Sequence, residues 1–220
     1  KVCSFEYASV IENSYTETGS VPPTKLYQYP MDNNLSLLPM FEKSDDRFSV
    51  SGARGILDGV QYAELDLPFT QSVLLVSGEY RRGELLLTTE DGIEVPCQVR
   101  SVQTKKTVSK GEDLSVSAKI ECDIFLTTLP EGFDITSNEG IKKTEEELAR
   151  LLEKKINKDW QKALEDGIED VFGLGIYLYR YAPRQYETWR KNNPNARLDF
   201  TVNCVITLEN AGYSEERIVE

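Results

Sequence analysis

Carboxylates are the side chains of this sequence most able to do chemistry, and they gather in two places. The first group is Glu145, Glu146 and Glu147, and the second is Asp166, Glu169 and Asp170. Paired carboxylates can serve a hydrolase as general acid and general base. Both groups lie in a stretch with helical periodicity, where acids in a first turn or on a wet face are usually solvated structural charges. We therefore expect no catalytic residues in either group.

Other reactive residue types are scarce. The 220 residues include no His, which excludes His-based triads, His general bases and the commonest metal ligand. The thiols show no C-x-x-C spacing, so we expect buried, reduced cysteines in place of a metal or redox site. They are Cys3, Cys97, Cys122 and Cys204. The sequence thus predicts no metal site and no cofactor.

Two further motifs carry weak signals. Gly52, Gly55 and Gly59 form a glycine-rich run, but the Lys-Ser/Thr pair of a phosphate-binding loop is missing and no long strand leads into a helix there. Lys105 and Lys106 form a short basic pair, which we interpret as a solvated edge that discourages strand pairing. Neither motif predicts a ligand site.

An aromatic group near the C-terminus allows two interpretations. It consists of Tyr177, Tyr179, Tyr181, Tyr186 and Trp189, interspersed with Arg180, Arg184 and Arg190. The first interpretation is packing between two short helices. The second is an exposed patch for a protein partner, because Tyr, Trp and Arg are enriched at binding hot spots.

Composition limits the class of protein. Apolar residues make up 40% and charged residues 28% of the chain, as in globular domains. The net charge of −12 argues against nucleic acid as a partner and against electrostatic docking on anionic lipid. No apolar run is long enough to span a membrane, and residues 1–7 do not resemble a secretory signal. Either the protein is cytosolic, or the numbering begins downstream of a removed N-terminal part.

One long amphipathic helix, predicted over residues 144–175, has to be positioned by the rest of the chain. Its apolar residues recur at three- and four-residue spacing, and Thr144 with Glu147 matches a capping box. Glycines at its end predict a bend near residues 171–175. A second helix is expected over residues 176–181, and a third from Pro183 to Trp189.

Three stretches with strand-like alternation predict the sheet on which this helix packs. Apolar alternation over residues 93–99 and 114–124, with a turn at Ser109–Glu112, predicts a long antiparallel hairpin. A register symmetric about that turn would place Cys97 and Cys122 opposite or diagonal to one another. Residues 198–208 alternate in the same way and predict a strand that pairs with the hairpin.

The fold class we predict is α+β, with an antiparallel or mixed sheet covered on one face by the long helix and shorter helices. A small αβ subdomain over residues 41–91 precedes it, with strands at 48–51, 62–65 and 84–89 and a helix from Asp66 to Gly78. Residues 1–40 read as a linker or the tail of a missing domain, with one short helix at Phe5–Ile11. Residues 92–220 form the α+β domain.

The order of these motifs resembles the C-terminal region of the Ger(x)C family of spore germination lipoproteins. The matching segments are residues 50–65 (VSGARGILDGVQYAEL), 170–175 (DVFGLG), 179–191 (YRYAPRQYETWRK) and 198–206 (LDFTVNCVI), followed by Gly212. The resemblance covers roughly residues 35–213. Members of this family are the C subunits of nutrient germinant receptors.

The resemblance implies a palmitate-bearing lipoprotein on the outer leaflet of the spore inner membrane, anchored outside this chain because Cys3 lacks a preceding apolar run. It implies multi-pass A and B subunits as partners, small nutrients as the signal, and no catalytic residues. The leading hypothesis is thus a non-enzymatic accessory subunit that acts through protein contacts. A rival is a module that binds the germinant itself in a pocket beside Tyr177–Trp189, and a third is a carboxylate-dependent hydrolase.

Overall fold

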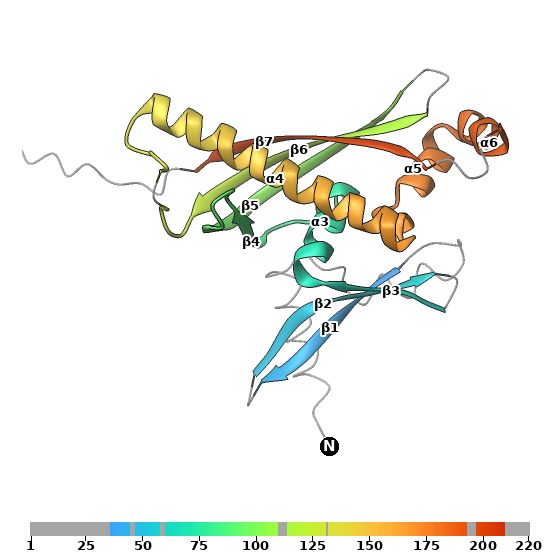
Figure 1. The fold of residues 1–220 in the computed structure, drawn as a ribbon, viewed down its shortest axis with the longest axis horizontal. Helices are drawn as coiled ribbons and strands as arrows, with labels where there is room; N and C mark the ends of the chain where they lie inside the picture. The colour runs from blue at the N-terminus through green and yellow to red at the C-terminus, as the bar shows by residue number, and fades with distance from the viewer. Residues whose placement is uncertain are drawn as a thin grey trace, which may run out of the picture.

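The chain folds into two β-sheets joined by a buried helix, with a long helix lying across the larger sheet (Figure 1). The computed structural model describes residues 36–44, 47–57, 60–109, 114–130, 132–192 and 197–209. The helix predicted at Phe5–Ile11 and the first part of the predicted linker lie outside these residues. The predicted α+β class is confirmed, as the element order and sheet topology below show.

The smaller sheet is an antiparallel meander of β1 (Ser36–Ser44), β2 (Arg47–Leu57) and β3 (Val60–Asp66). β1 begins inside the segment 1–40, which was predicted as a linker or the tail of a missing domain, and the division of the chain at residue 40 stays a prediction. Pro39 lies in β1, which is an edge strand, where a missing N–H is tolerated. The short strands predicted at 48–51 and 62–65 lie within β2 and β3 and are confirmed.

A buried helix, α3 (Leu67–Ser77), leads from the smaller sheet to the larger one. Asp66 caps it by accepting the Phe69 N–H at 2.8 Å, and Pro68 stands in its first turn. Gly78 ends it in the left-handed conformation, with φ of 84°. Phe69 to Val76 are all buried, and the predicted bounds of this helix are confirmed.

The larger sheet has the order β4-β5-β6-β7. Its strands are β4 (Gly83–Thr88), β5 (Glu94–Val108), β6 (Ser115–Leu126) and β7 (Asp199–Leu208). β4, β5 and β6 pair antiparallel, whereas β7 pairs parallel to β6. The predicted hairpin and its pairing with the C-terminal strand are therefore confirmed. The division at residue 91 stays a prediction; β4, which precedes it, belongs to the larger sheet.

The long helix, α4 (Asn138–Asp166), differs from its prediction at both ends. Ser137 is its N-cap and accepts the Gly140 N–H at 3.0 Å, so the capping box expected at Thr144 is wrong. Thr144 is buried in the second turn, where its hydroxyl donates to the Asp134 carbonyl at 3.0 Å. Gly167, with φ of 67°, ends the helix well before the predicted residue 175.

Three short helical segments follow α4. A 3-10 turn, η1 (Glu169–Phe172), leads into α5 (Leu174–Tyr181) and α6 (Pro183–Asn192). The predicted second and third helices are confirmed, while the predicted bend at 171–175 is a complete break between separate segments. In Figure 1, α5 and α6 form a compact unit at one end of the larger sheet, opposite the N-terminus of α4. We call residues 174–192 the α5–α6 hook.

The hydrophobic core lies between α3, α4 and one face of the larger sheet. The apolar stripe of α4 faces β7 and the hairpin strands and is almost fully excluded from water. Trp160 contacts Phe172 and Phe200 edge to face, with both ring centroids 5.3 Å away. This packing explains why an amphipathic helix of 29 residues is stable here, because its apolar face is matched by a sheet face.

The cysteine register differs from the prediction. Cys97 faces Leu126 and Cys122 faces Val102, so the two thiols are neither opposite nor diagonal. The ladder continues to Ser109, whose N–H donates to the Ser115 carbonyl at 3.0 Å. The register is consequently displaced along the strands from the symmetric register that was predicted. Cys97, Cys122 and Cys204 are free and buried, as predicted, while Cys3 lies outside the described residues.

Thiol accessibility gives a first test of this core. Burial raises the pKa of Cys97 and of Cys122 to about 12, so native protein at mildly alkaline pH should react very slowly with a thiol reagent at these positions. Denatured protein should show four free thiols both before and after reduction. Because these pKa values exceed the unfolded value of roughly 8.5, stability should fall as pH rises from there toward 12. Fewer free thiols before reduction would contradict the prediction.

Candidate protein-interaction site

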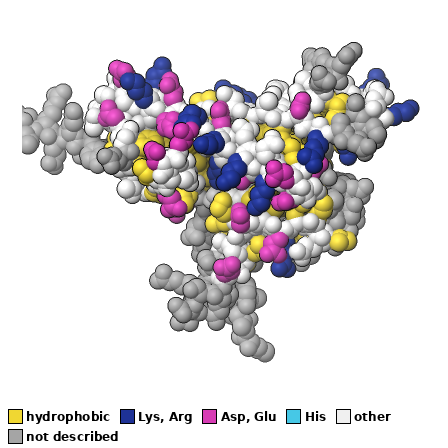
Figure 2. All heavy atoms as spheres, viewed as in Figure 1, with side chains coloured by type: hydrophobic (Ala, Val, Ile, Leu, Met, Phe, Trp, Pro, Cys, Tyr) yellow, Lys and Arg dark blue, Asp and Glu magenta, His cyan; other side chains and the backbone are white. Residues whose placement is uncertain are grey.

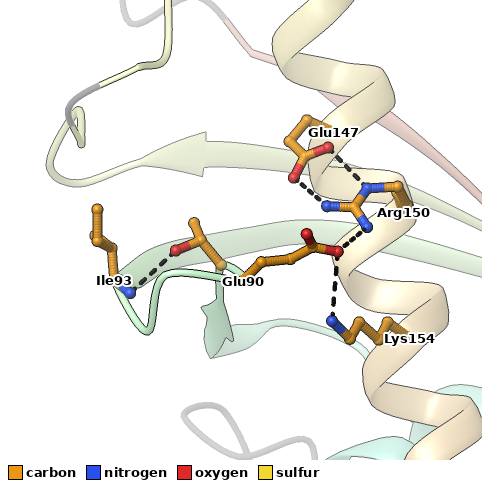
Figure 3. Close-up of polar contacts among 6 residues, drawn as sticks. Glu90, Ile93, Glu147, Arg150 and Lys154 are labelled. Carbon is orange, nitrogen blue, oxygen red and sulfur yellow. Dashed lines mark hydrogen bonds and ion pairs between the residues drawn. The ribbon is translucent and has the colours of Figure 1, made fainter.

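The first carboxylate cluster is engaged in structural contacts at the N-terminal part of α4 (Figure 3). Glu147 receives two hydrogen bonds from Arg150, at 2.7 and 2.9 Å, and Glu90 of the β4–β5 turn receives a third at 2.8 Å. These bonds lower the pKa of Glu90 and of Glu147. Both carboxylates are therefore ionised acceptors that join the turn to α4, and neither is suited to donate a proton as a general acid.

Another member of that cluster protects the edge of the larger sheet. β7 is an edge strand, and the backbone N–H of Leu208 donates to Glu145 at 2.9 Å. About two turns further along α4, Glu153 accepts the N–H of Cys204 at 2.7 Å. An open edge invites pairing with a foreign strand. The two glutamates occupy edge donors that such a strand would need, which gives Glu145 a structural role.

The second carboxylate cluster does not join the first. Asp166 is exposed in the last turn of α4, and Glu169 begins η1, whereas Glu145–Glu147 lie near the other end of the helix. At 1.5 Å per residue this separation is roughly 30 Å. The structure therefore does not place these two clusters as facing acids across one cleft. The structure does not describe the side chain of Asp170.

Gly52 serves close strand packing. A methyl group at Gly52 would overlap the Leu65 carbonyl oxygen of β3, so the residue permits the approach of two strands. Gly55 is buried within β2 as well, and Gly59 lies outside the described residues. The run is thus part of a sheet and does not open a helix, which agrees with its interpretation as a poor phosphate cradle.

Lys106 differs from its predicted role. Its ammonium group donates to the carbonyls of Val76 and Ser77, at 3.0 and 2.9 Å, at the C-terminus of α3. It also lies 5.3 Å from the ring centroid of Tyr177, and burial lowers the pKa of Lys106. The prediction of a solvated basic pair is therefore wrong for Lys106, although Lys105 is exposed. A cation at a helix C-terminus is favourable because it offsets the helix dipole.

The aromatic group divides between the two predicted interpretations. Tyr177, Tyr186 and Trp189 are half-buried against the core, and the Tyr177 hydroxyl donates to the Lys106 carbonyl at 2.6 Å. Tyr179 and Tyr181 are instead 61% and 72% exposed. The hook is anchored through Leu174 and Leu178, which are fully buried. Packing accounts for three of the five aromatic residues, and an exposed surface for the other two.

That exposed surface also carries the arginines named with the aromatic group. Arg180, Arg184 and Arg190 are all exposed, as is Lys191. Figure 2 shows Lys and Arg side chains at the end of the molecule that bears α6 in Figure 1. Exposed tyrosines beside arginines are the combination typical of protein-binding hot spots. The hook is our candidate interaction site.

A cavity of about 770 Å³ lies at the opposite end of the molecule, between the β4–β5 turn, the loop before α4 and the first turns of α4. Its wall includes Arg150, Lys143 and Asp134. Asp134 accepts hydrogen bonds from Thr136 and Ser137, which lower the pKa of its carboxyl. A smaller pocket of about 410 Å³ lies beside β3 and the end of α4. Neither pocket is lined by Tyr177–Trp189, where the rival hypothesis expects one.

Three structural contacts were not expected from the sequence: Glu90 with Arg150, Glu153 with β7, and Lys106 with α3. Each joins elements distant in sequence, so no local spacing signals them. Within the described residues, no group of three or more His, Cys, Asp or Glu side chains is arranged to hold a metal ion. Nor does any described helix have the length and apolar character needed to cross a bilayer.

Comparison with known proteins identifies the family. The model of the family described as spore germination B3/GerAC like, C-terminal, matches residues 56–212. A solved structure described as the crystal structure of the GerBC protein has the same fold, with a TM-score of 0.70 and 16% identity. The match covers 86% of this chain and 61% of that one, so the chain spans less than two thirds of its length. No curated protein sequence matches. The chain belongs to the spore germination B3/GerAC-like C-terminal family.

Proposed function

We propose that this chain is the C-terminal part of a non-enzymatic accessory subunit of a spore nutrient germinant receptor, acting through protein–protein contacts. A germination-related role follows from family membership, and the match over residues 56–212 is the observation that carries it. The proposed partners are the multi-pass A and B subunits. We further propose that the parent protein is held at the outer face of the spore inner membrane by a palmitate-type lipid anchor outside this chain.

The described side chains favour contact over catalysis. The Glu147 and Glu90 carboxylates are engaged by Arg150, and Glu145 is engaged by the edge of β7. The three described thiols are buried and their pKa values are raised by that burial, which suppresses the nucleophilic thiolate. Exposed tyrosines and arginines on the hook offer instead the kind of surface that binds protein.

Deleting the encoding gene tests this proposal. Spores without it should lose the response to one class of nutrient germinant, because a receptor without this subunit is incomplete. The same spores should still germinate with agents that bypass receptors, which controls for a general defect. The measurement is the loss of optical density of a spore suspension after each stimulus. An unchanged nutrient response, in a strain without a redundant receptor, would rule the proposal out.

A second candidate function is binding of a small germinant, and the cavity of about 770 Å³ is the observation that favours it. Its charged wall, which includes Arg150 and Lys143, is chemically suited to a small polar molecule. Titration calorimetry of the purified chain with the nutrient identified by the deletion experiment tests this function. Binding that Arg150→Gln removes and Lys158→Gln preserves would support it, since Lys158 does not line the cavity. If no heat of binding is measured, the germinant-binding function is rejected and the protein-contact role is the one that remains.

A further inference from the structure

The cations of the α5–α6 hook differ from most of those on α4, because none of them is ion-paired within the described part of the chain. On α4, ion pairs join Lys143 to Glu139 at 2.7 Å, Arg150 to Glu147 at 2.7 Å, and Lys155 to Asp159 at 2.9 Å. On the hook, none of the side chains that the structure describes forms an ion pair with the four cations. They are Arg180, Arg184, Arg190 and Lys191. All four are exposed, so their charged groups can contact an anion from outside the chain.

The hook is a basic region in an acidic chain. Residues 174–192 contain four cations and one carboxylate, Glu187, which gives a net charge of +3. The whole chain carries −12, so the remainder carries −15. Charge of one sign gathered at one end gives the molecule an electrostatic polarity that orients an approaching partner.

The hook also presents apolar surface that the fold does not cover. Tyr179 and Tyr181 are 61% and 72% exposed. α6 has ten residues and not one of them is buried. A helix this short is marginal on its own in water, and here it is held by contact with α5 and by Tyr186 and Trp189, which lie half-buried against the core. A partner lying on the hook would bury the two tyrosines and reinforce α6.

We propose that the hook is a docking site for an acidic segment of a partner protein, an inference that rests on the contact role proposed above. Arginine binds carboxylates through a planar fork, and tyrosine beside it adds apolar contact area. A short acidic segment can touch the hook alone. An extended anionic bilayer would also face the −15 of the remaining chain, and screening over about 8 Å only partly removes that repulsion. The charge distribution therefore favours a protein segment over a lipid surface.

Tryptophan fluorescence can report binding at the hook. Trp189 lies on the hook, stacked on Tyr186 with the ring centroids 6.4 Å apart, whereas Trp160 is buried in the core. The probe is a synthetic peptide of alternating Glu and Phe, titrated into the full chain at low and at high salt. We expect saturable binding that weakens at high salt, because the contact is between exposed charges. The double variant Arg180→Gln/Arg184→Gln should bind about tenfold more weakly.

The matched control removes two positive charges away from the hook. Lys142→Gln/Lys158→Gln makes the same change in net charge, yet Lys142 and Lys158 are exposed on α4 and line neither pocket, so peptide binding should equal that of the wild type. Circular dichroism confirms that each variant is folded. Equal weakening by the two double variants would overturn the proposal, since it would mean a general charge effect.

Two further measurements distinguish the acidic protein segment from other possible partners of the hook. Vesicles of phosphatidylglycerol that bind the hook when the peptide does not would overturn the proposal in favour of a lipid surface. Self-association of the chain that the arginine variants abolish, without peptide binding, would overturn it in favour of a second copy. Failure of the proposed germination function would give a different result from either of these. The gene deletion would then leave nutrient germination intact, while the peptide would still bind to the hook.

Discussion

Replacing Trp160 by alanine is expected to lower the free energy of unfolding by about 3–5 kcal/mol, the range typical of large-to-small aromatic substitutions in a core. Trp160 is only 3% exposed and joins Phe172 of η1 to Phe200 of β7 through edge-to-face ring contacts. Its removal opens a cavity at the place where α4, η1 and the larger sheet meet. Equilibrium urea unfolding of the purified variant, followed by circular dichroism, measures the loss.

A graded variant controls for this substitution. Trp160→Phe retains an aromatic ring at the same place and should cost clearly less than Trp160→Ala, because it leaves a smaller cavity. The order of stability is thus wild type, then Phe, then Ala. A loss below about 1 kcal/mol for the alanine variant would contradict the packing of α4 on the sheet, since that is the cost of a substitution away from a core.

Asp159→Ala is expected to cost about 3 kcal/mol, because it breaks a largely buried ion pair within α4 whose carboxylate also binds α3. Asp159 accepts from Lys155 at 2.9 Å and from the Ser72 hydroxyl of α3 at 2.6 Å. The side chains of Lys155 and Asp159 are 15% and 16% exposed. Without the carboxylate, the ammonium of Lys155 keeps its contacts to Ser72 and to the Pro68 carbonyl but remains an uncompensated charge.

The pH dependence of this variant has a definite sign. Burial already lowers the pKa of Lys155, and removing Asp159 takes away a contact that raises it. A lysine whose folded pKa lies below its unfolded value destabilises the fold while protonated. The cost of Asp159→Ala should therefore shrink as pH rises toward the unfolded pKa of roughly 10.4. Glu165→Ala, an exposed carboxylate on the same helix, should change stability by less than about 0.5 kcal/mol at every pH.

The sequence predicted those features that are encoded locally. Asp66, Pro68 and Gly78 mark both ends of α3 within one short stretch, and the structure confirms them. The alternation in β5, β6 and β7 likewise predicted three strands and the face they bury. The apolar spacing of α4 indicated that it lies on that face, because a long amphipathic helix needs an apolar surface to cover its own.

Features that depend on competing local signals were predicted less well. Two capping sites precede the apolar stripe of α4, at Ser137 and at Thr144, and the loop around Asp134 selects the first by binding the Thr144 hydroxyl. Gly167 ends the helix even though apolar spacing continues beyond it. The hairpin register depends on where its turn is centred, and a small displacement separates Cys97 from Cys122.

The candidate site shows the same division. Its residues, Tyr179, Tyr181 and the nearby arginines, were identified from composition, because Tyr and Arg mark binding surfaces. Their exposure could not be predicted, since it depends on which face of α5 the buried Leu174 and Leu178 turn toward the core. The role of Lys106 was equally hidden, because it requires the C-terminus of α3 to lie beside β5.

Germination of spores that carry hook variants tests the account most directly. The native gene is replaced by one encoding Arg180→Gln/Arg184→Gln, and by Lys142→Gln/Lys158→Gln as the control, with protein levels checked by immunoblot. We expect a slower or absent nutrient response from the arginine variant and a normal one from the control, with both responding normally to receptor-independent agents. A normal nutrient response from spores containing the arginine variant at wild-type level would contradict it.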